Sequence, residues 1–283
     1  MSDLGTGRPS DLNRRTAMTA LRSLAFNLAF YLNLIALMIF GLPLILRGRH
    51  GVFLLARLWS SSSRWLLETI CGLRIEYRGL HNIPKGGYIL AAKHESLLET
   101  FALLPYAPDF AIVLKRQLLF IPLFGLYLVA ARQIAIDRGR GHSALAQIIA
   151  QAREVVRAGR QVLIFPEGTR RPPGAPPRYK FGVAALYAET GASCLPVALN
   201  TGLFWGRRGF TRRPGVAVIE YLPPIPPGLE RDALAERLQA TIETACRRLN
   251  AEAVAADPRL APVLIAGAAA IDDAKANDAR QHA

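Results

Sequence analysis

The stretch YILAAKHESLLE, residues 88–99, decides the fold class. It opens with a short apolar run, which is typical of a buried strand, and passes through His94 into a segment with helical spacing. Similar short apolar runs alternate with helical segments along the chain, and this alternation predicts an α/β sandwich. The predicted strands are residues 74–77, 88–92, 110–114, 134–136, 162–165, 194–199 and 216–221. The predicted helices are residues 97–104, 118–130, 143–158, 183–189 and 231–250.

The N-terminal part of the chain has a different character. From Ser23 to Leu46 there are 24 consecutive residues without a charge, which as a helix would extend about 36 Å. Gly41 and Pro43 offer a bend inside this run, and residues 52–67 then mix large apolar side chains with arginines, as interfacial helices do. We therefore expect a two-helix membrane anchor over residues 1–70, spanning or re-entrant. An α/β domain over residues 71–250 follows, and then an Ala-rich tail over residues 251–283 with no evident packing role.

Composition excludes several classes of protein. The net charge is +14 while 51% of the residues are hydrophobic, so the chain is not a disordered basic tail. Its three cysteines are far apart, which argues against a structural zinc site and a disulfide framework. The apolar N-terminus, and the absence of basic residues interleaved with aromatics, disfavour a nucleic-acid binder. Half of the net charge lies between Arg132 and Lys180, which indicates a local site for an anion.

His94 is the histidine with chemistry nearby, because Glu95 and Glu99 follow it at a predicted strand-to-helix turn. A histidine with an acidic partner is a general base suited to neutral pH. The offset of five residues to Glu99 does not share a helix face, so His94 would have to lie just before the first turn. The alternative is a solvated histidine with Glu99 as a favourable charge at a helix start. A zinc-binding HExxH motif is excluded by Leu98.

A second cluster, VLIFPEGTR at residues 162–170, ends an apolar strand with Glu167, Gly168, Thr169 and Arg170. Glycine lets backbone approach a ligand closely, and arginine suits bidentate capture of a phosphate. The alternative is a solvated basic loop. The chain has no GxSxG, Walker or GxGxxG motif.

Together these residues resemble the glycerolipid acyltransferase family, and most of all its 1-acylglycerol-3-phosphate acyltransferases, over about residues 73–221. The family's first motif is His-x4-Asp, and here Glu99 stands in place of the aspartate. The second motif is similar to residues 132–138, with Arg132 where glycine is usual. The third is matched in full by residues 165–170, and the fourth resembles residues 195–200.

The resemblance implies a mixed central sheet flanked by helices, and acyl transfer from an acyl-carrier-protein or coenzyme A thioester to the sn-2 hydroxyl of lysophosphatidate. In that reading His94 is the general base and Glu99 holds its ring, without a covalent intermediate. The acceptor would be bound by Arg138, Glu167, Gly168, Thr169, Arg170 and Lys180. Backbone N–H groups near Gly168 could stabilise the oxyanion. No metal and no bound cofactor would be required, and the catalytic domain would face the cytoplasm at the inner cell membrane, in contact with phospholipid.

Three alternatives remain open. The acceptor could be another lyso-lipid, such as a lyso-aminolipid without a phosphate, or glycerol-3-phosphate. The chain could also be a peripheral membrane protein that binds phospholipid without chemistry.

Overall fold

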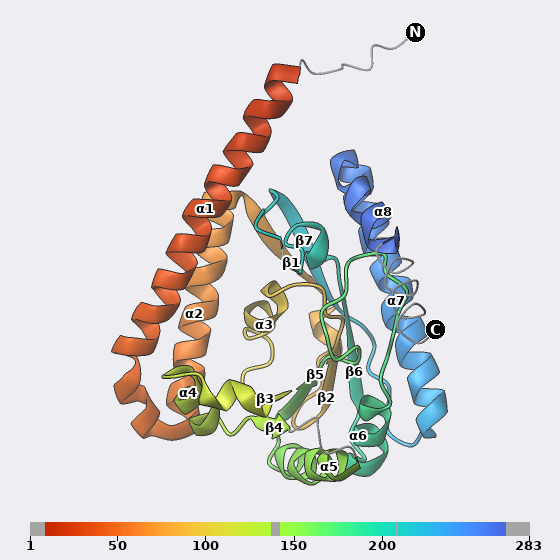
Figure 1. Ribbon diagram of the computed structural model, residues 1–283. Coiled ribbons are helices and arrows are strands. Elements are labelled where there is room, and N and C mark those ends of the chain that lie inside the picture. Colours follow the sequence, from red (N-terminus) through yellow and green to blue (C-terminus); the bar gives the residue numbers. More distant parts are fainter. Residues whose placement is uncertain (1–8, 137–141, 208, 270–283) are drawn as a thin grey trace, which may run out of the picture.

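The computed structural model describes residues 9–136, 142–207 and 209–269. Within them, seven strands form one sheet in the order β1-β7-β6-β2-β5-β3-β4, and only the β6–β7 pairing is antiparallel (Figure 1). The mixed sheet and all seven predicted strands are confirmed. The strands are β1 (Leu73–Arg78), β2 (Ile89–Ala92), β3 (Phe110–Lys115), β4 (Ile134–Ile136), β5 (Gln161–Ile164), β6 (Cys194–Leu199) and β7 (Gly215–Tyr221).

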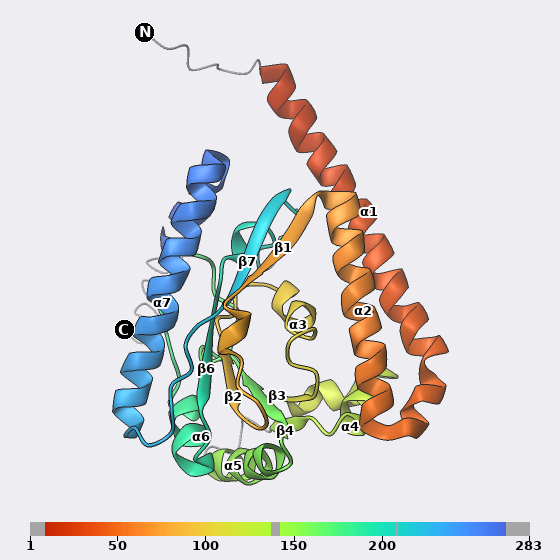
Figure 2. The same cartoon turned by 180° about the vertical axis from the view of Figure 1, so that it is seen from behind.

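Helices cover both faces of the sheet (Figures 1 and 2). One side holds α1 (Pro9–Phe40), α2 (Gly48–Cys71), α3 (Leu98–Ala102) and α4 (Phe124–Ala130). The other holds α5 (His142–Arg157), α6 (Gly182–Thr190) and α7 (Arg231–Ala256). The central strands β2 and β6 are buried along their whole length, as expected for strands with a helix layer on each face. The hydrophobic core is therefore divided into two layers by the sheet.

The N-terminal helices form an antiparallel hairpin along the domain. α1 ends at Phe40, a short 3-10 turn runs from Leu42 to Arg47, and α2 begins at Gly48. The expected bend at Gly41 and Pro43 is thus confirmed. Asn33 on α1 donates a hydrogen bond of 2.9 Å to the Ser62 hydroxyl on α2, which joins the two helices near their middle.

The hairpin and the α/β domain share one hydrophobic core. Phe26 and Phe30 of α1, with Leu67 of α2, are fully or almost fully buried in the same cluster as Leu90 of β2 and Leu98 of α3. Removal of three such side chains from their partners would cost several kcal/mol. The described part of this region, residues 9–70, therefore packs against the α/β domain.

The described part of the C-terminal segment, residues 251–269, is packed, although no packing role was expected from residue 251 onward. Helix α7 continues to Ala256, a 3-10 turn covers Pro258–Leu260, and α8 spans Ala261–Ala269. Leu260 is 2% exposed. A Cβ added at Gly267 would lie 1.9 Å from the carbonyl oxygen of Pro173, so α8 touches the loop after β5 at a residue without a side chain.

The helix predicted for residues 118–130 is interrupted. A 3-10 turn over Arg116–Phe120 comes first, Leu123 has a φ of 65°, and α4 begins only at Phe124. Pro122 has no N–H to donate to a preceding carbonyl, which explains the break. Leu126 and Val129 on α4 are exposed, so this short helix adds apolar surface rather than core.

Candidate active site

The two motif clusters meet because of the strand order. β6, β2 and β5 are neighbours in the sheet and run parallel, so their carboxyl ends lie at one edge. His94 follows the central strand, Glu167 follows β5, and Thr201 follows β6. Sites in open α/β sheets are commonly built at this edge.

His94 lies in the loop between β2 and α3, as predicted. Its ring stacks on Phe165, with centroids 3.8 Å apart and planes inclined by 15°. The side chain is 12% exposed, and its Nδ1 is 3.7 Å from Oε2 of Glu99, which is fully buried. Nδ1 is buried and has no hydrogen-bond partner among the described residues. The carboxylate is therefore the acceptor placed to receive an Nδ1–H once the gap closes by about 0.8 Å.

Glu99 is held by the turn in front of its own helix. Its Oε1 accepts hydrogen bonds from the backbone N–H of Glu95 (3.0 Å) and of Ser96 (2.8 Å), and from the Thr201 hydroxyl (2.6 Å). Its Oε2 accepts a further bond from the N–H of Ser96 (3.0 Å). The extra methylene compared with aspartate thus lets one carboxylate satisfy N–H groups at a helix start and still face His94.

Thr201 was not predicted from the sequence. It follows directly after the fourth motif, residues 195–200, and only the pairing of β6 with β2 brings its hydroxyl to Glu99. The signal in the sequence that could have found Thr201 is its position directly after a buried strand and after the segment that resembles the fourth motif.

Glu167 lies in the site but points inward. Its Oε1 is 3.0 Å from Nζ of Lys93, and Lys93 is also 2.7 Å from Oε1 of Glu243 on α7. Burial alone would lower the pKa of Lys93, but the two carboxylates raise it above its usual value. Glu167 also accepts a bond of 3.4 Å from the backbone N–H of His94. The Glu167 carboxylate is thus engaged in holding the His94 loop.

Glu95 is another buried carboxyl, noted beside His94 in the sequence but not assigned a role there. It is 1% exposed, and its Oε2 accepts a hydrogen bond of 3.0 Å from the N–H of Gly202. Burial raises the pKa of Glu95 well above its usual value, Lys93 opposes this, and Glu99 adds to it. Glu95 and Glu99 are therefore both tied to the Thr201–Gly202 turn.

The basic loop after β5 presents the other predicted residues. Gly168 has a φ of 66°, and a Cβ there would meet the side chain of Lys180 at 3.2 Å. Thr169 and Lys180 are exposed and Arg170 is partly exposed, so these side chains are accessible to an anion. Arg138, assigned to the acceptor by the resemblance, lies outside the described residues.

The expected oxyanion donor at Gly168 has another partner. The N–H of Gly168 donates a hydrogen bond of 2.9 Å to the carbonyl of Phe165. Nearby, the N–H of Arg171 donates to the carbonyl of His94 at 2.8 Å. These two bonds shape the loop around His94, and neither N–H is free for a reacting oxygen.

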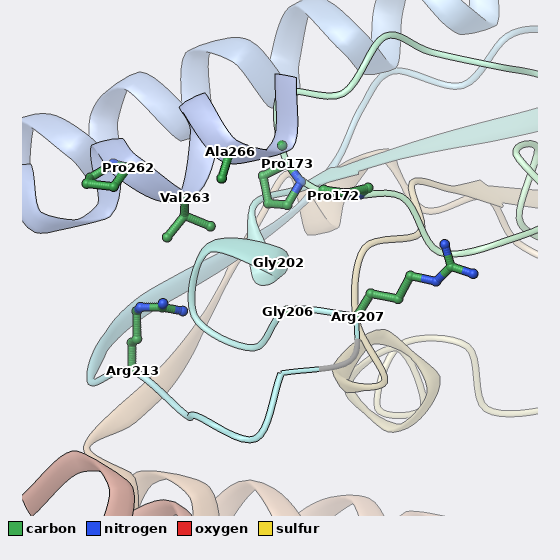
Figure 3. Close-up of a pocket in the computed structure, with 10 residues that line it drawn as sticks. Pro172, Pro173, Gly202, Gly206, Arg207, Arg213, Pro262, Val263 and Ala266 are labelled. Atoms are coloured by element: carbon green, nitrogen blue, oxygen red, sulfur yellow. The ribbon is translucent and has the colours of Figure 1, made fainter. Parts of the chain in front are cut away.

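A pocket of about 400 Å³ lies beside the Thr201–Gly202 turn (Figure 3). Its walls come from α8, from the loop after β5 and from the segment between β6 and β7. In Figure 3, Arg213 and Arg207 stand on opposite sides of it. The lining residues are Pro172, Pro173, Gly202, Gly206, Arg207, Arg213, Pro262, Val263, Ala266 and Gly267. The pocket thus combines apolar walls with two cations.

An apolar surface runs along the N-terminal hairpin. Residues Thr16–Phe40 of α1 have a mean hydropathy of 1.9 over an 18-residue window, of which 17% is buried, and theirs is the one helix in the described part of the chain long and apolar enough to cross a membrane. Its outward side chains include Leu28, Leu32 and Ile35, each more than half exposed. The apolar face suggests membrane association.

The chain is similar to several known proteins. Residues 74–200 match the family model described as Acyltransferase. A curated relative, the 1-acyl-sn-glycerol-3-phosphate acyltransferase of Pseudomonas aeruginosa, is 41% identical over 157 residues. That alignment covers 56% of this chain and 61% of the relative. The human 1-acyl-sn-glycerol-3-phosphate acyltransferase alpha is 28% identical over 193 residues, covering 66% of this chain and 68% of that protein.

The fold also has a solved counterpart. The crystal structure of the 1-acyl-sn-glycerophosphate acyltransferase PlsC from Thermotoga maritima matches with a TM-score of 0.69. The match covers 81% of this chain and 96% of that one, at 23% sequence identity. The similarity therefore extends beyond residues 74–200 and shows that this chain shares the fold of PlsC over most of its length.

Proposed function

We propose that this protein transfers an acyl chain from an acyl thioester to the sn-2 hydroxyl of 1-acylglycerol-3-phosphate, giving phosphatidate. The observation that carries the proposal is the His94–Glu99 pair at the carboxyl edge of the sheet, directly beside the basic loop of Thr169, Arg170 and Lys180. The named activity of the aligned relatives supports the same acceptor.

In the proposed reaction, His94 takes the proton of the glycerol hydroxyl through Nε2 as the hydroxyl oxygen attacks the thioester carbonyl. Its Nδ1–H, turned to Glu99, stabilises the imidazolium that forms. The tetrahedral intermediate then collapses, the carbon–sulfur bond breaks, and the thiolate takes the proton back from His94. The steps need no covalent enzyme intermediate, metal or bound cofactor.

The acceptor phosphate would lie on the exposed loop after β5. Arg170 can bind a phosphate in bidentate fashion, and Thr169 and Lys180 add a hydroxyl and a charge. Arg138 joins this set by its place in the second motif. Glu167 has the different task of fixing Lys93 and the His94 loop, since a carboxylate at the phosphate itself would repel it.

The donor would enter from the pocket beside Gly202. Both carrier-protein and coenzyme A thioesters end in a phosphopantetheine arm, which is a thin chain of methylene, methyl and amide groups with one hydroxyl and one phosphate. The apolar walls under α8 suit the methylene and methyl groups of the arm, and Arg213 or Arg207 suits its phosphate. In kinetics with each donor, Arg213→Gln should raise KM for the donor and leave KM for lysophosphatidate within about twofold. A rise for lysophosphatidate alone would assign the pocket to the acceptor instead.

The N-terminal hairpin would hold the domain at the membrane that contains the acceptor. Basic residues lie at both ends of the apolar run, with Arg22 before it and Arg47 and Arg49 at the hairpin turn after it. They favour a re-entrant or tilted α1 with both ends of the run on the cytoplasmic side of the inner membrane. Cleavage at both ends of the run by a protease added to sealed inside-out vesicles, but not to right-side-out vesicles, is the expected result.

The central experiment supplies purified protein with an acyl-carrier-protein or coenzyme A thioester and one acceptor at a time. The acceptors are lysophosphatidate, a lyso-aminolipid and glycerol-3-phosphate, and each acylated product is measured. Wild type should form phosphatidate, His94→Ala should lose at least about 100-fold in kcat, and the exposed-site control His81→Ala should match wild type. If another acceptor is used instead, that acceptor replaces lysophosphatidate. If no acceptor is used, phospholipid binding without chemistry is the better account.

A further inference from the structure

Arg212 is a buried cation that no part of the proposed reaction uses. It lies in the connection between β6 and β7 and is 6% exposed. Burial lowers its pKa to about 10, so it stays charged at neutral pH, and within the described chain no carboxylate forms an ion pair with it. A buried charge without a counter-ion is costly. We therefore expect the buried charge of Arg212 to have a role.

The contacts of Arg212 attach the β6–β7 connection to α1. Its Nη2 donates a hydrogen bond of 2.7 Å to Oδ1 of Asn27, and its backbone N–H donates one of 2.8 Å to the Ser23 hydroxyl. Its guanidinium carbon lies 3.9 Å from the ring centroid of Trp205 and 5.9 Å from that of Phe26. Stacking on Trp205 and hydrogen bonding to Asn27 together fix the guanidinium between the helix and the connection.

Trp205 is connected to Glu99 and Glu95 through the Thr201–Gly202 turn. Its backbone N–H donates a hydrogen bond of 2.9 Å to the carbonyl of Thr201, closing the turn whose Thr201 hydroxyl holds Glu99 and whose Gly202 N–H holds Glu95. One short turn thus connects the stacked indole to both carboxyl groups.

A second contact leads from the hairpin to the helix that carries Glu99. Phe101, two residues after Glu99, is fully buried and lies 5.7 Å from Phe30, 5.4 Å from Trp59 and 6.1 Å from Trp205, between ring centroids. The hairpin therefore contacts α3, the helix that carries Glu99, in addition to its connection through the Thr201 turn.

We propose that Arg212 is a positioning residue that couples α1 to the Thr201–Gly202 turn, so that the seating of α1 sets the alignment of Glu99 with His94. The buried side of α1 contacts Arg212, while the opposite face of α1 carries exposed leucines and isoleucines. A lipid surface that binds this exposed face therefore acts on the same helix that contacts Arg212. This inference rests on the proposed function for the meaning of that alignment.

The test compares Arg212→Met, Arg212→Lys and Asn27→Ala with the exposed control Arg237→Met on α7. Arg212→Met should lower kcat by about 10- to 100-fold, as expected for a small displacement of a catalytic group. KM for both substrates and binding to phospholipid vesicles should stay within about twofold. Arg212→Lys keeps the charge without the planar fork, and its kcat should lie between those of wild type and Arg212→Met. The kcat of Asn27→Ala should lie in the same range. If Arg212→Met does not fold, Asn27→Ala takes its place in the test.

The decisive comparison is with Thr201→Val, which removes the hydroxyl that holds Glu99. If Arg212→Met and Thr201→Val disturb the same alignment of Glu99 with His94, the double variant should lose little more kcat than the worse single variant. The coupling would be overturned if the kcat losses of the two single variants multiplied in the double variant, or if folded Arg212→Met kept the kcat of wild type. The ring-carbon NMR signals of His94 supply a readout independent of turnover. Arg212→Met and Thr201→Val should shift them alike, even if the acceptor of the proposed reaction proves to be wrong.

Discussion

Glu99→Gln removes the negative charge of the carboxylate and keeps nearly the same side-chain shape. Of the two Glu99 oxygens, Oε1 accepts three hydrogen bonds from Glu95, Ser96 and Thr201, whereas Oε2 accepts one from Ser96 and faces His94 Nδ1 at 3.7 Å. A glutamine that keeps its carbonyl oxygen at the Oε1 position preserves the three bonds. Its NH₂ group then points at His94.

The consequence for catalysis follows from the tautomer of His94. An amide N–H that donates to Nδ1 leaves the ring proton on Nε2, and Nε2 can then no longer accept the proton of the hydroxyl. The buried imidazolium also loses its counter-charge. We expect kcat to fall by about 10³- to 10⁴-fold, a loss of the size seen when a catalytic histidine loses its carboxylate.

The fold should tolerate the change. A hydrogen bond to a neutral acceptor is weaker than one to a carboxylate by about 1 kcal/mol, and the bond from the Ser96 N–H to Oε2 is lost because an NH₂ group cannot accept it. Three weakened bonds and one lost bond together should lower the unfolding free energy by about 4 kcal/mol. Denaturant unfolding in detergent measures this cost, and acyl transfer under saturating substrates measures kcat. Glu236→Gln, at an exposed position of α7, is the matched control. A folded Glu99→Gln protein within tenfold of wild type would refute the orienting role of Glu99.

Three further changes probe the surroundings of the site. Because burial raises the pKa of Glu95 well above its usual 4.5, the folded protein keeps a proton that the unfolded chain releases, and wild-type stability should fall as the pH rises above about 4.5. Glu95→Gln should flatten that decline in urea unfolding at pH values from about 5 to 9, and an unchanged slope would count against it. Lys93→Met leaves Glu167 and Glu243 without their shared cation and should cost about 3–5 kcal/mol of unfolding free energy, whereas a loss below about 1 kcal/mol would mean that the two carboxyls are neutral. Arg132, exposed and with a φ of 51°, pays for a left-handed backbone that glycine adopts freely. Arg132→Gly should therefore raise thermal stability by up to about 1 kcal/mol, and a lower melting temperature would contradict this reading.

The sequence by itself determined the strands, most of the helices and the place of His94 and Glu99 as a candidate site. Strand runs such as residues 194–199 and the motif at 165–170 depend on neighbouring residues alone, so they can be recognised locally. The same holds for the bend at Gly41 and Pro43, and for the strand-to-helix turn that carries His94. The glycine expected at residue 132 has a local reason too, since the backbone there has a positive φ.

Only the tertiary structure decided which side chains meet. Thr201 reaches Glu99 because β6 lies beside β2, a pairing made across about a hundred residues of chain. Glu167 turns toward Lys93 because α7 brings Glu243 to the same buried cation. Arg212 joins the β6–β7 connection to Asn27 of α1 across 185 residues of sequence. Apolar periodicity reports which face of an element is buried, but not which neighbour covers it, and for that reason these three contacts were out of reach of the sequence.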